Sequence, residues 1–207
     1  MIDNYEKTEF GIIKQKNISK KFVYDSNYSI QRYDSYKELS VYMSYLRYGF
    51  IQGSIGRLPN SILDVGYGNG SFLKICSRTI SKCYGMDVSD YPIPNNCQKI
   101  ENFDRHFDVI TFFDSLEHFE DISFVKQLNC NYICVSVPEC HYFSDEWFYS
   151  WKHRRPDEHL WHFNAESLIK FMVNCGFSLI NYTNLEDIIR DNGEPYSNIL
   201  TAIFKKV

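Results

Sequence analysis

The segment from residue 61 to 74 constrains the fold of this chain more than any other. A short apolar run of Ile62, Leu63 and Val65 is typical of a buried parallel strand. Glycines follow at alternate positions, 66, 68 and 70, and a helical pattern begins directly after them. This order lets a ligand approach the backbone closely, because glycine has no Cβ. The spacing departs from the Gly-x-Gly-x-x-Gly fingerprint of dinucleotide-binding proteins, since position 71 is serine.

The composition is that of one globular domain with a substantial core. The chain has 207 residues, of which 44% are hydrophobic and 23% are charged. Its formal net charge of −4 argues against a general electrostatic attraction to nucleic acid. Seven cysteines without a Cys-x-x-Cys pair predict reduced thiols and a cytoplasmic location. Neither a signal sequence nor a membrane span is recognisable, so no membrane partner is expected.

Strands and helices alternate along most of the chain. Apolar runs predict strands at residues 61–65, 82–87, 98–103, 107–114, 132–137, 177–185 and 198–205. The spacing of apolar residues predicts helices that begin near residues 34, 70, 117 and 164. The order predicts an α/β fold, with a Rossmann-like, doubly wound and mostly parallel seven-stranded sheet and a C-terminal antiparallel hairpin.

The N-terminal region differs in character from the rest. Residues 1–33 are polar and rich in tyrosine, without a sustained period, and a helix follows them. We expect residues 1–58 to form an arm and helix that act as a lid or cap within the same domain. Residues 59–207 are then expected to form the ligand-binding domain itself.

Several polar segments follow predicted strands directly. Ligands of such sheets bind at the carboxyl ends of the strands, near the point where the strand order reverses. The glycine turn, Asp87, residues 114–118 and the segment after Pro138 all lie at such ends. We therefore expect them to converge on one site. A carboxylate at Asp87 can accept hydrogen bonds from both hydroxyls of a ribose, and its alternative role is to cap a turn.

Two motifs in this order resemble those of a known enzyme family. Residues 64–70 read Asp-Val-Gly-Tyr-Gly-Asn-Gly, and residues 114–118 read Asp-Ser-Leu-Glu-His at the end of a strand. With Asp87 between them, the chain resembles the class I S-adenosylmethionine-dependent methyltransferases over about residues 60–180, close to the small-molecule and sugar methyltransferases. The resemblance implies S-adenosylmethionine as cofactor and methyl transfer to oxygen or nitrogen of a small-molecule or sugar-like acceptor.

The resemblance also implies which residues bind the cofactor. Asp64 is expected to shape the site, and residues 114–116 to line the methionyl and adenosyl parts. The expected residues are Asp64, Gly66, Tyr67, Gly68, Gly70, Asp87, Val88, Asp114, Ser115 and Leu116. Arms in similar proteins fold over the cofactor, so Tyr28 and Tyr33 are expected to join it as a lid. Packing of the arm against the outer sheet is the alternative.

The chain departs from the family between Asp87 and Asp108. The short distance between them means that the usual helix and third strand must be abbreviated. The residue that contacts adenine therefore has no single counterpart, and Glu101, Asn102 and Asp104 compete for that role.

A sulfonium methyl group is already activated, so its transfer needs mainly alignment and exclusion of water. A hydroxyl acceptor also needs a base, whereas an anionic acceptor or a free amine does not. Glu117 and His118 match a pair at the mouth of the methyl-transfer site, and His141 follows the next strand. The two imidazoles are alternative bases, because histidine titrates near neutral pH.

Histidine, tryptophan and arginine are concentrated in one segment. Residues 138–164 contain four of the six histidines and all three tryptophans. Because the segment leads from a strand into the expected site, we expect it to determine acceptor specificity. Arg154 and Arg155 can hold an anionic group, or pair internally with Asp157 or Glu158. The expected substrate-binding residues are Trp147, Trp151, Arg154, Arg155, His159 and His162, although the tryptophans can instead form the segment's own core.

The same segment raises a zinc site as an alternative. His159-x-x-His162 with His141, Cys140 or His153 offers ligand types that zinc takes. These partners are dispersed along the chain, so no metal is predicted.

Other functions stay open. A nucleic-acid or protein methyltransferase is one alternative, but a nucleic-acid enzyme would prefer a basic face, and the Asn-Pro-Pro-Tyr motif of amino-methylating nucleic-acid enzymes is absent. A non-catalytic cofactor-binding partner protein is another alternative. Degenerate glycines in the turn would favour it, whereas all three glycines are intact in this chain. The sequence leaves the oligomeric state open.

Overall fold

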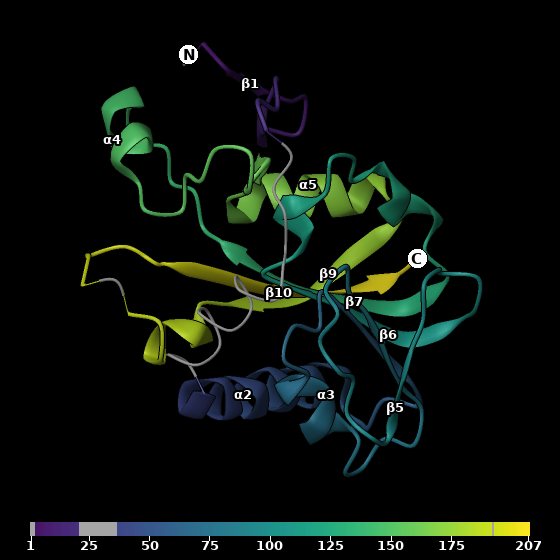
Figure 1. The fold of residues 1–207 in the computed structure, drawn as a ribbon. Helices are drawn as coiled ribbons and strands as arrows, with labels where there is room; N and C mark the ends of the chain where they lie inside the picture. The colour runs from purple at the N-terminus through teal and green to yellow at the C-terminus, as the bar shows by residue number, and fades with distance from the viewer. Residues whose placement is uncertain (1–2, 21–36, 192) are drawn as a thin grey trace.

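A seven-stranded sheet lies at the centre of the computed structural model, which describes residues 3–20, 37–191 and 193–207 (Figure 1). The strand order is β5-β4-β3-β6-β7-β10-β9. Its strands are β3 (Ile62–Val65), β4 (Cys83–Met86), β5 (Cys97–Lys99), β6 (Phe107–Phe113), β7 (Cys130–Pro138), β9 (Phe177–Thr183) and β10 (Ile199–Lys206). The first five pair in parallel, and β10 runs antiparallel to both β7 and β9. The predicted fold is confirmed.

Helices cover both faces of the sheet (Figure 1). Helices α2 (Lys37–Ile55) and α3 (Ser71–Cys76) lie on one face, and α5 (Ala165–Asn174) lies on the other. Helix α5 begins at a capping box, in which Asn164 accepts from the backbone N–H of Ser167 at 2.9 Å. It ends before Gly176, which has a φ of 84°.

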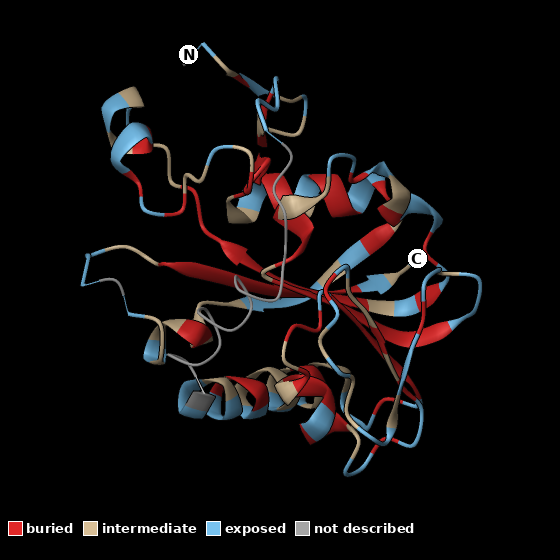
Figure 2. Ribbon diagram, viewed as in Figure 1, coloured by how far each residue is buried: buried red, intermediate tan, exposed pale blue. Residues whose placement is uncertain are grey.

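The core lies on both sides of the central strands. All seven residues of β6 are buried, because helices cover both of its faces (Figure 2). Neighbouring residues of a strand point to opposite faces. Phe112 accordingly belongs to the core cluster that contains Leu168 and Phe171 of α5, whereas Phe113 belongs to the cluster that contains Ile51 and Phe72 of α2 and α3. The central strands are thereby held rigidly beneath the loops at their carboxyl ends.

The helix predicted from residue 117 to 128 is not formed. The structure has two short 3-10 turns instead, η1 (Leu116–His118) and η2 (Ser123–Gln127). Asp121 accepts from both the backbone N–H and the hydroxyl of Ser123, at 2.8 and 2.6 Å. Such local side-chain bonds compete with helical hydrogen bonds and interrupt the helix.

A second, small sheet was not predicted. Strands β1 (Tyr5–Lys7) and β2 (Ile13–Gln15) form a hairpin, and β8 (Trp161–His162) pairs with β2. Helix α4 (Asp145–Ser150) precedes β8, and η3 (Leu185–Ile188) follows β9. The segment 139–163 thus contains a helix and a strand, and the first part of the N-terminal arm packs against it.

The connection from β4 to β6 is short, as the sequence predicts. Strand β5 has three residues, and no helix forms in residues 87–96, all of which the structure describes. None of the helices in the described part of the chain combines the length and the apolar character that crossing a membrane requires.

Candidate functional site

The glycine turn after β3 has the backbone conformation that its sequence requires. Gly66 and Gly70 have φ angles of 81° and 71°, in the left-handed region that favours glycine. A Cβ on Gly66 would lie 2.7 Å from the Cβ of Ser115, and one on Gly70 would lie 2.8 Å from the ring of Pro94. Because Gly66 is also exposed, the turn presents bare backbone at the carboxyl end of the sheet.

Asp87 lies beside this turn, directly after β4. Its Oδ2 accepts from the backbone N–H of Gly68, and its Oδ1 accepts from the backbone N–H of Ser89, both at 2.8 Å. These bonds fix the carboxylate next to the glycine turn. Each carboxylate oxygen can accept a further hydrogen bond, as a ribose diol requires. Val88 is largely exposed at the same edge.

Asp64 and Tyr67 are buried beneath the turn. Thr111 donates to Asp64 Oδ1 at 2.7 Å, and burial raises the pKa of the Asp64 carboxyl to about 6. The hydroxyl of Tyr67 donates to the backbone carbonyl of Tyr91 at 2.6 Å. Asp64 and Tyr67 are both almost fully buried, so in this structure they support the turn from below rather than line its open side.

Asp114 is held by two arginines. It has a φ of 53°, and its carboxylate contacts Arg47 of α2 and Arg190, each at 2.8 Å. Both arginines also bind Glu186 of η3, at 2.7 and 3.0 Å. Although burial raises the pKa of the Asp114 carboxyl, the charges of Arg190 and Arg47 hold it well below its usual range. The carboxylate is therefore ionised and fixed in position.

Ser115 and Leu116 continue from this anchored residue. The Ser115 hydroxyl donates to the carbonyl of Val65 at 2.6 Å, which ties the end of β6 to the end of β3. Leu116 is fully buried. The structure thus brings Ser115 against the glycine turn, as the sequence predicts, and leaves Leu116 in the core.

Glu117 and His118 lie in η1, next to His159. The Nδ1 atom of His118 is 2.8 Å from the carbonyl oxygen of Glu158, and its Nε2 atom is 3.9 Å from Oε1 of Glu117. The rings of His118 and His159 meet edge to face, with centroids 4.7 Å apart. Burial lowers the pKa of His159 well below its usual value. The sequence suggested His118 as a base and His159 as a substrate-binding residue, but in the fold the two side chains are in contact.

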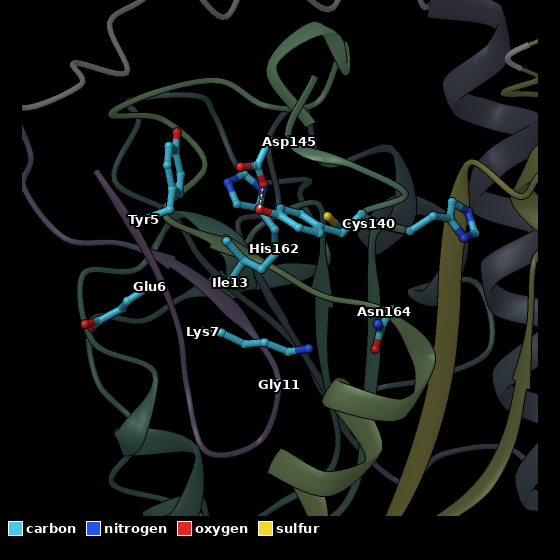
Figure 3. A pocket seen from close by; sticks show the side chains of 11 residues that line it. Tyr5, Glu6, Lys7, Gly11, Ile13, Cys140, Asp145, His162 and Asn164 are labelled. Carbon is cyan, nitrogen blue, oxygen red and sulfur yellow. Dashed lines mark hydrogen bonds between the residues drawn. The ribbon is translucent and has the colours of Figure 1, made fainter. Parts of the chain in front are cut away.

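His141 lies in different surroundings. Its Nε2 is 2.8 Å from the carbonyl oxygen of Ser197, and its ring stacks on Phe143. It lines a cavity of about 330 Å³ between the β1–β2 hairpin and the segment after β7 (Figure 3). The cavity is lined by Tyr5, Glu6, Lys7, Gly11, Ile13, Cys140, His141, Tyr142, Asp145, His162 and Asn164.

The tryptophans expected to bind substrate pack against their own segment. The rings of Trp147 and Trp151 stack with centroids 5.4 Å apart, and Trp147 Nε1 donates to the hydroxyl of Tyr196 at 3.2 Å. Trp151 is buried in a cluster that includes Tyr5 and Phe148. This arrangement corresponds to the alternative in which the tryptophans form the segment's own core.

The arginines of the segment also have internal partners. Arg155 contacts Glu158 at 3.2 Å, the internal pairing that the sequence left open. The guanidinium of Arg154 lies over the rings of Tyr5 and Tyr149, 5.5 and 4.8 Å from their centroids. His162 is enclosed by aromatic rings, and burial lowers its pKa to about 3.

Some predicted residues cannot be placed, and some important ones were not predicted. Tyr28 and Tyr33 lie outside the described residues. Arg47, Glu186 and Arg190 were missed, because they are distant in sequence from every motif and only the folded chain brings them to Asp114. The available signal for Arg47 was that it is the single charged residue between Glu38 and Arg57.

Comparison with known proteins gives a family and a fold. The sequence profile of the family described as "Methyltransferase domain" matches residues 47–182. No curated protein matches the chain in sequence.

Three crystal structures with the same fold illustrate the likeness. Magnesium protoporphyrin IX methyltransferase from Synechocystis, with bound S-adenosylhomocysteine, is 14% identical with a TM-score of 0.58, covering 81% of this chain and 83% of that chain. The 1,6-didemethyltoxoflavin-N1-methyltransferase from Burkholderia thailandensis, with 1,6-didemethyltoxoflavin and S-adenosylhomocysteine, is 11% identical with a TM-score of 0.59, covering 99% of both chains. An S-adenosylmethionine-dependent methyltransferase from Clostridium acetobutylicum is 12% identical with a TM-score of 0.60, covering 87% of this chain and 98% of that chain. At these identities the likeness is one of fold.

Proposed function

Because this chain belongs to the methyltransferase domain family, we propose that it transfers a methyl group from S-adenosylmethionine to oxygen or nitrogen of a small-molecule or sugar-like acceptor. The resemblance seen in the sequence is confirmed by the family match and by the fold, which is that of class I S-adenosylmethionine-dependent methyltransferases. The prediction of S-adenosylmethionine as cofactor is also confirmed, since structural neighbours hold S-adenosylmethionine or its demethylated product.

The observation that carries the proposal is the juxtaposition of the glycine turn, Asp87 and Ser115. The turn offers exposed backbone at Gly66, and the Asp87 carboxylate is fixed 2.8 Å from the backbone nitrogen of Gly68. These residues fit an adenosyl ligand, because the carboxylate can accept from the ribose hydroxyls while the turn leaves room for the ligand. When bound, the cofactor supplies a methyl group on a positively charged sulfur.

The residues around Asp114 have a positioning role in this proposal. The two arginines fix the end of β6, and with it Ser115 against the glycine turn. A fixed arrangement is what methyl transfer needs, since alignment accounts for much of such a rate enhancement. For a hydroxyl acceptor, the assignment of a base to His118 or His141 stays a prediction, with His118 favoured because it lies three residues beyond Ser115.

A small acceptor is favoured over a nucleic acid by the charges. The net charge is −4, and the most basic segment offers little open positive surface, since Arg155 pairs with Glu158 and Arg154 packs on two tyrosines. The acceptors named for the two neighbours above, magnesium protoporphyrin IX and 1,6-didemethyltoxoflavin, differ from each other, so the fold alone does not select one.

We also propose the domain organisation and location that the sequence indicates. Helix α2, within the proposed arm-and-helix region 1–58, is joined to the main domain through Arg47 and its two acidic partners. This contact supports one domain rather than two. The seven cysteine thiols are free, which supports a reducing compartment such as the cytoplasm.

Thermal titration tests the cofactor. S-adenosylmethionine and S-adenosylhomocysteine should each raise the melting temperature, because a ligand that binds only the folded state stabilises it by mass action. NAD serves as the control and should have no effect. The variant Gly68→Val should abolish the response, since a branched side chain at a φ of 52° is strained and occupies the turn. Stabilisation by NAD alone would overturn the proposal.

A further inference from the structure

A carboxylate and two imidazoles form a compact cluster next to the proposed methyl-transfer site. Glu117, His118 and His159 each offer one possible ligand atom, and these three atoms lie within 4.8 Å of one another. Glu117 and His159 are buried and His118 is half-buried. Two imidazoles with one carboxylate are the protein ligands of many open metal sites, in which the remaining positions are left for water or substrate.

The hydrogen bond of His118 determines which of its nitrogens can bind a metal. A carbonyl oxygen only accepts, so Nδ1 of His118 donates to the carbonyl of Glu158 at 2.8 Å. In the neutral ring Nε2 then carries the lone pair, and it lies 3.9 Å from Oε1 of Glu117. A lone pair and a carboxylate oxygen repel each other, and either a proton or a metal ion between them removes that repulsion. A donated Nδ1–H is also the usual orientation of histidines that bind metals.

His159 contributes the third ligand. It is buried beside His118, and one of its possible ligand atoms lies within 4.8 Å of those of Glu117 and His118. Its ring meets that of His118 edge to face, so the two imidazoles approach without stacking. Both rings can therefore turn a nitrogen toward a common point.

Backbone contacts hold the two ligand segments together. The backbone N–H of Leu160 donates to the carbonyl of Glu117 at 2.8 Å, on one side of His159. The His118 ring bonds the carbonyl of Glu158 on the other side. These two contacts lie on either side of His159. They hold it next to Glu117 and His118, as a preorganised metal site requires.

We propose that Glu117, His118 and His159 bind a divalent first-row transition metal ion. Three atoms no more than 4.8 Å apart leave a centre at most about 2.8 Å from each, against metal–ligand distances of about 2.0–2.2 Å, so side-chain movements of less than about 1 Å close the site. The set differs from the zinc ligands that the sequence suggested. His162 is instead enclosed by Tyr5, Phe148 and Trp151, and His141 contacts Ser197.

A metal ion here would act on the acceptor, a role that rests on the proposed methyl transfer. An acceptor hydroxyl bound to the metal loses its proton more readily, as a metal-bound water does. The O–H bond breaks and the proton passes to solvent, an O–CH₃ bond forms, and the S–CH₃ bond of the cofactor breaks to leave a neutral thioether. Under this proposal His118 is a metal ligand rather than the base.

Metal binding can be measured on the whole chain without cofactor or acceptor. Mn²⁺ suits the titration, because its preference for oxygen and nitrogen ligands limits binding to the seven free thiols. Electron paramagnetic resonance should detect one saturable Mn²⁺ site. Co²⁺ should give visible absorption typical of nitrogen and oxygen ligands, without a thiolate charge-transfer band.

Matched variants test the ligands. His118→Gln and His159→Gln should each weaken Mn²⁺ binding at least about tenfold. His162→Gln is the control, since it removes another buried histidine of the same segment and should leave Mn²⁺ affinity unchanged. Circular dichroism of each variant shows whether it folds.

The results separate this inference from the proposed function. Absence of saturable Mn²⁺ and Co²⁺ binding to the wild-type chain would overturn the inference, even if no variant folds. Unchanged affinity in both ligand variants, or loss of affinity in His162→Gln, would also overturn it. A chain that binds metal but does not respond to S-adenosylmethionine would contradict the proposed function alone.

Discussion

The guanidinium of Arg47, in helix α2, donates to the carboxylate of Asp114 at the end of β6, with an Nη2–Oδ2 distance of 2.8 Å. The same guanidinium binds Glu186, which is fully buried and also accepts from the hydroxyl of Ser136 at 2.7 Å. Arg190 contacts both acids and completes a group of two positive and two negative charges. A helix, the central sheet and the turn after β9 therefore meet at one residue of the proposed active site.

Arg47→Ala should be strongly destabilising. It leaves two largely desolvated carboxylates with one arginine between them, and breaking such a buried pair costs about 3–5 kcal/mol. Urea denaturation measures the free energy of unfolding. Arg78→Ala is the control, because Arg78 is exposed and its side chain donates to the hydroxyl of Tyr45, so the loss of this side chain should cost less than about 1 kcal/mol. Equal effects in the two variants would mean that the buried group contributes little to stability.

Gly66→Ala should destabilise the glycine turn. The left-handed φ of 81° costs about 1–2 kcal/mol for a residue with a Cβ. The new Cβ would also lie 2.7 Å from the Cβ of Ser115, so Gly66→Ala should cost less in a Ser115→Gly background than in the wild type. Gly53→Ala is the matched control in helix α2. It meets no atom within 4 Å and should stabilise the chain by about 0.5–1 kcal/mol. An equal cost of Gly66→Ala in the two backgrounds would show that the contact with Ser115 is unimportant.

Asp87→Ala should weaken binding of S-adenosylhomocysteine by about 1–3 kcal/mol, roughly fivefold to 150-fold. The substitution removes the acceptor proposed for the ribose hydroxyls and also the bonds that hold Gly68 and Ser89. Calorimetry measures the affinity directly. The control Asp90→Ala changes an exposed acid of the same loop and should leave the affinity unchanged. If Asp87→Ala binds as tightly as the wild type, Asp87 does not contact the ligand.

The main sheet could be predicted because its signals are local. Continuous apolar runs such as residues 107–113 and a glycine turn at a strand end are visible without knowledge of the fold. The small sheet could not be predicted, because its strands have only two or three residues and β2 pairs with β8 across more than a hundred positions of the chain. The false helix after β6 has a local cause, since Asp121 and Ser123 bond each other instead of continuing a helix.

The same distinction applies to the candidate site. Residues 64–70, Asp87 and Ser115 follow strands in sequence, so topology alone predicts that they converge. Arg47 contacts Asp114, 67 residues away in the sequence (114 − 47), and His118 contacts His159, 41 residues away (159 − 118). No periodic pattern in the sequence predicts contacts between such distant residues. The histidines were grouped by sequence spacing, whereas the fold groups them by the loops on which they lie.

The buried histidines should make the fold sensitive to acid. Burial lowers the pKa of His162 to about 3 and that of His153 to about 4, below the value of about 6.5 for an unfolded histidine. The unfolded chain therefore binds protons that the folded chain does not, starting as the pH falls below about 6.5. Stability is complete above that pH and is lost on acidification toward the folded-state pKa values, by about 2 kcal/mol for each histidine at pH 5.

His162→Phe tests this assignment. Phenylalanine suits the surrounding rings of Tyr5, Phe148 and Trp151 and cannot be protonated. Urea denaturation between pH 6 and 4.5, with EDTA present to remove metal ions, gives the slope of the unfolding free energy against pH. That slope should fall by about 1.4 kcal/mol per pH unit relative to the wild type, the contribution of one proton. The slope is informative even if the substitution changes the absolute stability. His106→Gln alters an exposed histidine and should leave the slope as it is. An unchanged slope in His162→Phe would mean that His162 is already protonated in the folded chain, or that it stays neutral in both states.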